Sequence, residues 1–80
     1  MSPSESRHPS TVHLLSLFET DHLPEHLRAV SDRSQTMAHL MVARLEDGPE
    51  LSAGLRHLVE AKDCFVRQAV IDHKATEAQA

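Results

Sequence analysis

With 80 residues and only two side chains of the Phe, Tyr and Trp class, the chain has material for one small domain with a limited core. Twelve acidic residues against eight Lys and Arg give a net charge of −4, which argues against binding to a nucleic-acid polymer through phosphate neutralisation. The single cysteine, Cys64, excludes an internal disulfide and favours a reducing cytoplasm, and no apolar run is long enough to span a bilayer.

The first nine residues carry two prolines and three serines with almost no apolar side chain. We predict a disordered leader over residues 1–9, which lacks the basic and apolar regions of a signal peptide. Ser10 is the expected N-cap of the dense apolar segment that follows, and this segment predicts a short helix, although its pattern would also suit a strand. Pro24 suits the first position of a second helix, with Asp21 or His22 near its cap.

Two long amphipathic helices are predicted over residues 24–46 and 49–73, because apolar side chains recur there at steps of three and four. Phe65 belongs to the apolar stripe of the second of these helices. Gly48 fits the C′ position of the first of these helices, and Pro49 fits the first position of the second. Gly54 lies inside the second helix, where it costs about 1 kcal/mol relative to alanine. A glycine at such a position hints at close packing.

The predicted fold class is all-α, with a short N-terminal helix followed by a long antiparallel helical hairpin. The hairpin domain is expected at residues 10–76 and a frayed tail at residues 77–80. Each long arm would span ~33 Å at 1.5 Å per residue. Two long helices and a short one cannot enclose a core, because each arm keeps apolar surface that its partner does not cover. We therefore expect the chain to be oligomeric.

Seven histidines raise the question of a metal site, and His22 and His26 are four residues apart. Pro24 separates them at a helix start, so they are not an i,i+4 pair on one continuous helix. We predict surface or capping histidines, with no metal and no cofactor. Cys64 has no histidine at close helical spacing, and the sequence carries no glycine-rich phosphate loop or nucleophile elbow. These patterns predict a protein without enzymatic activity.

The basic residues of the two long helices permit two interpretations. Arg28 and Arg33 come early in the first of these helices, whereas Lys62 and Arg67 belong to the second. Paired with acidic neighbours at helical spacings, they would form an ordinary solvated face. In a symmetric oligomer each arginine recurs around an axis, where several guanidinium groups could hold a cyclic ligand with several phosphates.

The order of residues adds a resemblance that covers about residues 12–70. The positions that carry it are Phe18-Glu19-Thr20-Asp21-His22-Leu23-Pro24, Leu27, Val30-Ser31, Ala38, Asp47-Gly48-Pro49-Glu50-Leu51, Leu55-Arg56, Leu58, Glu60-Ala61-Lys62-Asp63 and Val66-Arg67. This pattern resembles the small helical-hairpin family of phage anti-CBASS sponges, which sequester cyclic oligonucleotide messengers. A similar hairpin occurs in anti-Thoeris sponges.

The resemblance implies a non-catalytic homohexamer in the cytoplasm of an infected host cell. Such proteins hold cyclic dinucleotides between subunits, and some members hold cyclic trinucleotides on threefold axes, so that immune signalling is blocked. The family's polar and basic pocket positions correspond to the neighbourhood of Ser31 and Arg33, and Arg67 matches a recurrent position suited to an axial phosphate contact. The ligand-binding residues expected on this basis are Phe18, Thr20, His22, Arg28, Ser31, Arg33, Lys62 and Arg67.

This sequence departs from the family at the aromatic residue that stacks on a base. In the family that residue comes just before the stretch that corresponds to His22-Leu23-Pro24, and here the matching position is Thr20 or Asp21. Base stacking contributes ~1–3 kcal/mol per base, so its loss matters for affinity. Phe18 is the nearby aromatic side chain that could substitute, and packing of Phe18 in the core is the favoured alternative.

Two other function classes stay open beside the sponge. One is a structural or adaptor hairpin whose exposed flanks bind other proteins. The other is a small DNA-binding regulator, which the acidic balance and the absence of a short helix-turn-helix spacing disfavour.

Overall fold

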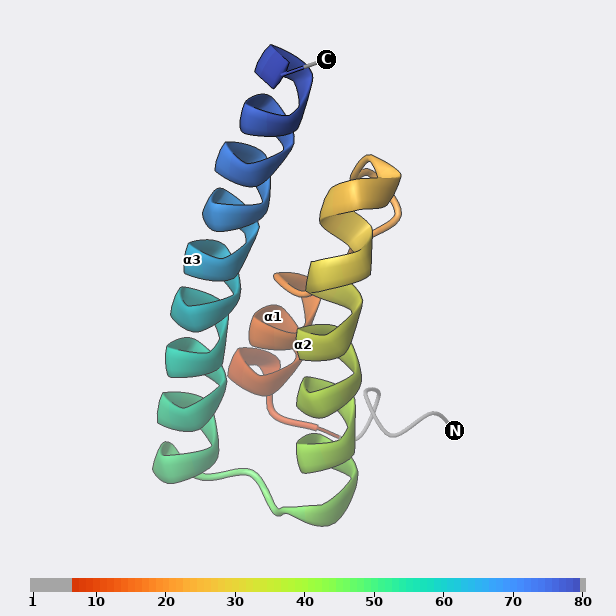
Figure 1. Ribbon diagram of the computed structural model, residues 1–80. Coiled ribbons are helices and arrows are strands. Elements are labelled where there is room, and N and C mark those ends of the chain that lie inside the picture. Colours follow the sequence, from red (N-terminus) through yellow and green to blue (C-terminus); the bar gives the residue numbers. More distant parts are fainter. Residues whose placement is uncertain (1–6, 80) are drawn as a thin grey trace.

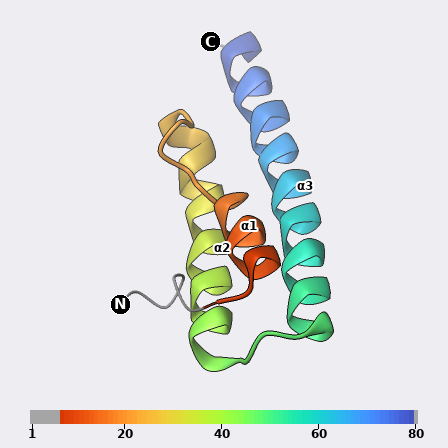
Figure 2. The ribbon, with the colours of Figure 1, turned by 180° about the vertical axis from the view of Figure 1, so that it is seen from behind.

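A computed structural model describes residues 7–79, and this part of the chain is entirely helical apart from its turns. The helices are α1 (Pro9–Ser16), α2 (Glu25–Arg44) and α3 (Pro49–Gln79). α2 and α3 run antiparallel as a hairpin (Figure 1), and α1 packs against both of them on the side that faces the viewer in Figure 2. The predicted all-α fold, a short helix followed by a long hairpin, is confirmed.

The start of α1 differs in detail from the prediction. His8 is the N-cap, and its ring Nδ1 accepts a hydrogen bond from the backbone N–H of Ser10 at 3.0 Å. Ser10 lies inside the first turn because Pro9 occupies the first helical position, where a missing N–H costs nothing. The prediction of Ser10 as the N-cap was therefore wrong by two residues.

The ends of α2 also lie inside the predicted limits. Pro24 is the N-cap and not the first helical residue, and the helix ends at Arg44 because Leu45 is extended, with φ −119° and ψ 150°. The predicted C′ role of Gly48 is wrong, since Gly48 lies well beyond the helix end and has no positive φ. Pro49 starts α3 as predicted.

α3 continues beyond its predicted end near residue 73. The rings of His26 and His73 stack, with their centroids 3.9 Å apart, so the start of α2 lies beside His73. The last turns of α3 therefore extend past α2, as Figure 1 shows. Of the predicted tail at residues 77–80, residues 77–79 are helical and Ala80 lies outside the described residues.

The C-terminal end of α2 is capped by Arg7, which lies 35 residues or more away along the chain. Its guanidinium donates to the carbonyl oxygens of Val42 at 2.8 Å and Leu45 at 2.6 Å. Carbonyls at a helix end lack partners within the helix, so this contact satisfies groups that would otherwise need water. Residues 7–9 are thus part of the packed structure, whereas residues 1–6 of the predicted leader lie outside the described residues.

Asp47, in the turn between α2 and α3, joins this segment to the hairpin. Its carboxylate accepts hydrogen bonds from the backbone N–H of His8 at 2.9 Å, from the hydroxyl of Thr11 at 2.8 Å and from Nε of Arg7 at 2.9 Å. The bond from His8 is the largest cause that lowers the pKa of Asp47 below its ordinary value of 3.8, followed by that from Thr11. One carboxylate therefore holds α1 and the Arg7 cap in place.

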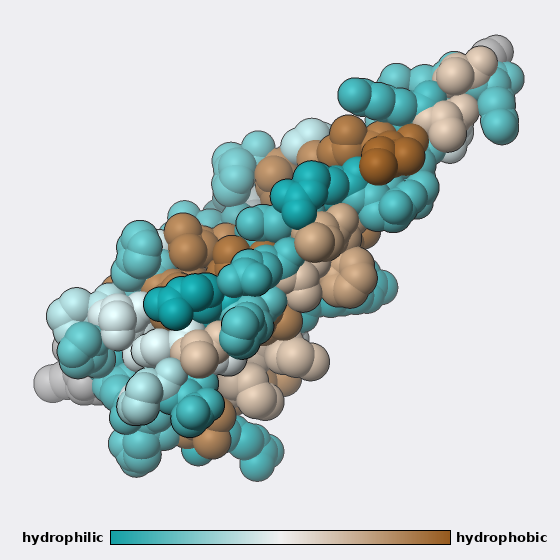
Figure 3. Space-filling view, turned by 90° about the vertical axis from the view of Figure 1, so that its left-hand side faces the viewer, coloured by the Kyte–Doolittle hydropathy of each residue, from teal (hydrophilic) through white to brown (hydrophobic). Residues whose placement is uncertain are grey.

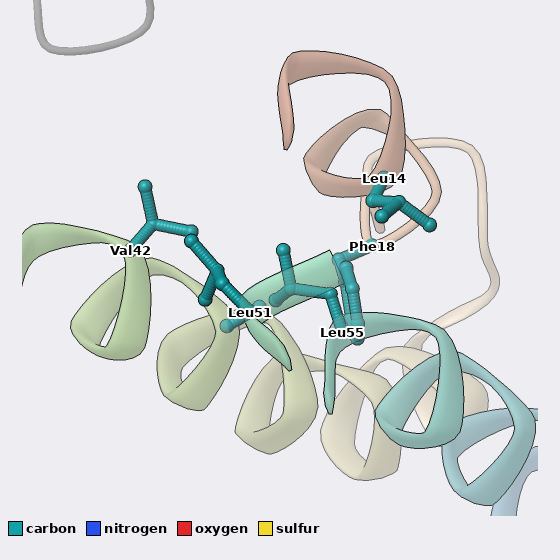
Figure 4. Packing of buried hydrophobic residues seen from close by; sticks show 6 residues of the cluster. Leu14, Phe18, Val42, Leu51 and Leu55 are labelled. Atoms are coloured by element: carbon teal, nitrogen blue, oxygen red, sulfur yellow. The ribbon is translucent and has the colours of Figure 1, made fainter. Parts of the chain in front are cut away.

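The core lies where α1 meets the hairpin. Phe18, just after α1, is completely buried, and Figure 4 shows Phe18 and Leu14 directed toward Leu55 of α3. Among residues 7–79 the buried hydrophobic side chains are Leu14, Phe18, Ala38, Val42, Leu51 and Leu55. This is a small core, as the composition indicated.

The role of Asp47 can be tested through the pH dependence of stability. A carboxylate whose pKa is lowered by folding stabilises the protein above its unfolded-state value, and this contribution is lost as pH falls through the lowered value. We expect Asp47→Asn to be less stable than the wild type at neutral pH, and the difference to shrink below about pH 4. Urea unfolding followed by circular dichroism at several pH values measures both effects. Asp21→Asn removes an exposed carboxylate between α1 and α2, and its stability should equal that of the wild type at each pH. Parallel stability curves for Asp47→Asn and the wild type would contradict this role.

Candidate functional site

A long groove runs between α2 and α3, and no residue of α1 lines it. We call its half beside the α2–α3 turn the turn-end groove, and its other half the open-end groove. The turn-end groove has a volume of about 480 Å³ and is lined by Met37, Met41, Leu45, Glu46, Gly48, Pro49, Glu50, Leu51, Gly54, Leu55 and Leu58. The open-end groove has a volume of about 710 Å³ and is lined by Val30, Arg33, Ser34, Met37, Leu58, Phe65, Gln68, Ala69 and Asp72. Met37 and Leu58 line both halves, so the groove is continuous.

The turn-end groove is dominated by hydrophobic side chains that are open to solvent. Met37, Met41 and Leu45 are all exposed along the second half of α2, and Leu40 is exposed next to them. Figure 3 views the molecule from the side of α3 and shows further hydrophobic side chains between hydrophilic ones along its length. These side chains form hydrophobic surface that the described part of the chain leaves uncovered.

Gly54 lies inside α3, near the start of this helix, and lines the turn-end groove. A Cβ atom built at this position would meet nothing within 4 Å. The close packing that the sequence suggested at this glycine is therefore not made by any part of residues 7–79. The open space above Gly54 is available to another molecule.

The open-end groove brings together side chains that can hold a charged aromatic ligand. Phe65 of α3, which is 60% exposed, and Arg33 of α2 both line this groove. The guanidinium of Arg33 donates to the carbonyl of Ala29 in its own helix and forms no ion pair within residues 7–79. Gln68 Nε2 donates to the Asp72 carboxylate at 2.8 Å. The groove therefore offers positive charge, an aromatic face and an amide–carboxylate pair.

Three of the ligand-binding residues expected from the sequence lie in the interior. Phe18, Thr20 and Ser31 have exposed fractions of 0%, 4% and 1%. Phe18 is a core side chain, which agrees with the alternative that it packs in the core, and its ring presents no face to a base. Ser31 Oγ has no hydrogen-bond partner within residues 7–79, and burial of a hydroxyl in this way costs stability. In this arrangement the side chains of all three residues are closed off from solvent.

The remaining expected residues are dispersed. Lys62 donates to the carbonyl of Leu17 at 3.0 Å and so caps the end of α1. Arg67 donates to Cys64 Sγ at 3.3 Å. Lys62 and Arg67 do not line the groove, and neither do His22 and Arg28. Of the expected residues, Arg33 alone lines the open-end groove.

Sequence reasoning assigned Phe65 to the apolar stripe of its helix and missed Gln68 and Asp72. These three residues follow one another at steps of three and four, which places them on one helical face. That spacing could have predicted that the three residues share a surface. It could not have predicted that Arg33 of α2 lines the same groove, because the sequence does not show which residues of the two helices lie opposite one another.

The groove's side chains can hydrogen bond, stack and hold negative charge, which is binding chemistry. Within residues 7–79, no three His, Cys, Asp or Glu side chains gather in a way that could hold a metal ion. None of the helices in this range combines the length and the apolarity needed to cross a bilayer. No family model, curated protein or solved structure matches the chain.

The two phenylalanines separate core from groove and can be compared directly. Phe18→Ala should lower the free energy of unfolding by about 3–5 kcal/mol, because it leaves a cavity in a small core. Phe65→Ala should change it little, since that ring is exposed. Urea denaturation of both variants gives the two values. A tolerated Phe18→Ala would return Phe18 to the list of candidate ligand contacts.

Proposed function

We propose that this protein is a non-catalytic sponge that binds cyclic di- or trinucleotide messengers and keeps them from their effectors. The function is suggested by the resemblance of its sequence to phage anti-CBASS sponges, which act in the cytoplasm of an infected cell. The observation that carries it is the placement of Arg33 and the exposed Phe65 in one groove. A cyclic dinucleotide requires both of these groups, one for a phosphate and one for a base.

Arg33 supplies the phosphate contact. A guanidinium without an ion pair can direct two N–H groups at the oxygens of a phosphate, and such charge-assisted bonds are stronger than neutral ones. Arg33 has no carboxylate partner within residues 7–79 and lies at the groove. The alternative, in which the arginine is paired with an acidic neighbour on a solvated helix face, is therefore not favoured for Arg33.

Phe65 supplies the stacking surface that the buried Phe18 does not. Its ring is 60% exposed, and stacking of a base on it would contribute ~1–3 kcal/mol. The volume of the open-end groove, about 710 Å³, is within the range of small-molecule sites. The departure of this sequence from the family's stacking position is thus compensated from the other end of the chain.

The turn-end groove is the surface at which a second copy of the chain docks in this proposal. The core is too small to make a robust monomer, and oligomerisation is a common solution in chains of this length. Gly54 costs its helix about 1 kcal/mol with no steric reason inside the chain. A helix of a second copy that approaches closely over Gly54 accounts for that cost. A hexamer is the assembly that the resemblance implies.

The adaptor hypothesis remains the second candidate, and the same surface favours it. A helix of another protein could lie in the turn-end groove in place of a second copy. An adaptor of this kind would be a monomer when purified alone and would bind no cyclic nucleotide.

Assembly is tested by light scattering at low micromolar concentration. We expect a mass several times that of one 80-residue chain. Gly54→Ala should raise helix stability by about 1 kcal/mol, because alanine is the better helix former and has space here, yet it should weaken the assembly. Circular dichroism provides the control for folding. A folded wild-type monomer, or an undiminished assembly in Gly54→Ala, would contradict docking at this groove.

Ligand binding is tested by calorimetry with one cyclic dinucleotide and one cyclic trinucleotide. Arg33→Ala should weaken dinucleotide binding by about 1.5–3 kcal/mol, the range for hydrogen bonds to charged groups, and leave the oligomer intact. Arg67→Ala, outside the groove, should spare the dinucleotide and weaken only a trinucleotide bound on a symmetry axis. Arg56→Ala is the matched control on an exposed arginine. Equal losses of affinity in all three variants would indicate a general electrostatic attraction to positive charge and not a specific binding site.

A further inference from the structure

The open-end groove contains a carboxylate as well as the arginine that would hold a phosphate. Asp72 and Arg33 both line it, and Asp72 accepts a hydrogen bond from Gln68 Nε2 at 2.8 Å. A carboxylate repels phosphate, so a site for phosphate alone would be better without it. A ligand that also carries hydrogen-bond donors can use this carboxylate as an acceptor.

Guanine and adenine differ in the hydrogen-bonding groups that they present to such a carboxylate. An ionised carboxylate is an acceptor only, with two oxygens. Guanine presents two neighbouring donors on its Watson–Crick edge, N1–H and the N2 amino group, which match two carboxylate oxygens. Adenine presents one donor, at N6, beside the N1 lone pair, and that lone pair would face the carboxylate unfavourably. A carboxylate in the groove therefore discriminates between the two purines.

The positions of Phe65, Gln68 and Asp72 on α3 suit one residue that stacks on a base and another that contacts the edge of that base. Gln68 and Asp72 lie about one and two helical turns beyond Phe65 on the same face. A base stacked on Phe65 can direct its edge along the groove toward Asp72, while its phosphate lies toward Arg33 on α2. The hydrogen bond from Gln68 restricts the rotamers of Asp72 and so orients the carboxylate.

We propose that Asp72, oriented by Gln68, reads the Watson–Crick edge of guanine and makes the open-end groove selective for guanine-containing cyclic dinucleotides. This inference rests on the proposed function, since it specifies the ligand of the same site. Asp72 is the specificity determinant, Gln68 is a positioning residue, and Phe65 and Arg33 contribute affinity that does not depend on the base.

The experiment is calorimetry of the full chain with cyclic di-GMP and cyclic di-AMP. The wild type should bind cyclic di-GMP roughly tenfold or more tightly than cyclic di-AMP, the ratio expected for one hydrogen bond to a charged acceptor. Asp72→Asn should lose most of this preference through weaker binding of cyclic di-GMP. Asp32→Asn is the matched control, because it removes the same charge next to Arg33 from an exposed position outside the groove. It should keep the preference.

Each outcome separates the inference from the function on which it rests. Equal binding of both ligands by the wild type, or equal weakening of both in Asp72→Asn, would overturn guanine selectivity and leave the sponge standing. Binding of neither ligand would overturn guanine selectivity, and it would overturn the sponge as well if the cyclic trinucleotide also failed to bind. Circular dichroism of each variant shows that the helices are retained, and Asp72 is exposed, so its replacement leaves the core intact.

Discussion

The carboxylate of Asp47 is the contact on which the packing of this small protein depends. An eight-residue helix such as α1 is not stable by itself in water, so tertiary contacts must hold it. Asp47 provides them by accepting from Arg7, His8 and Thr11, and Arg7 in turn satisfies the carbonyls at the end of α2. Once α1 is held there, the chain that leaves it carries Phe18 into the core. Lys62 completes the arrangement by capping the other end of α1.

The position of α1 decides which surface of the hairpin is left for function. Because α1 packs on one side of α2 and α3, the groove lined by those two helices alone stays open. Its two halves differ in chemistry, with exposed methionines and leucine beside the turn and charged, amide and aromatic groups toward the open end. The first half suits apolar contact with another protein surface, and the second suits a small polar ligand. The proposed assembly and the proposed ligand site therefore share only Met37 and Leu58.

The agreement between prediction and structure follows the range of the interactions involved. Helix existence and type were predicted correctly because the 3.6-residue periodicity is local and survives in any packing. The helix ends were less well predicted, since Ser10 and Gly48 are good capping residues whose places were taken by other groups. At the end of α2 the competing group is Arg7, and no local pattern announces a partner 35 residues away. For the candidate site, Arg33 was anticipated by its charge, whereas Phe65 was assigned to the core stripe.

The sequence by itself determined that the protein is all-helical, that a short helix precedes a long hairpin, and that the hairpin keeps uncovered apolar surface. These properties depend on residue spacing and on the ratio of apolar to polar side chains, which are set before the chain folds. Only the tertiary structure decided which of the apolar and basic side chains make contacts within the fold and which stay exposed. It buried Phe18 and exposed Phe65, and it assigned Arg7 and Lys62 to helix ends while it left Arg33 at the groove. The reason is physical: residues of one type have the same intrinsic preference, and the packing of α1 against the hairpin distinguishes between them.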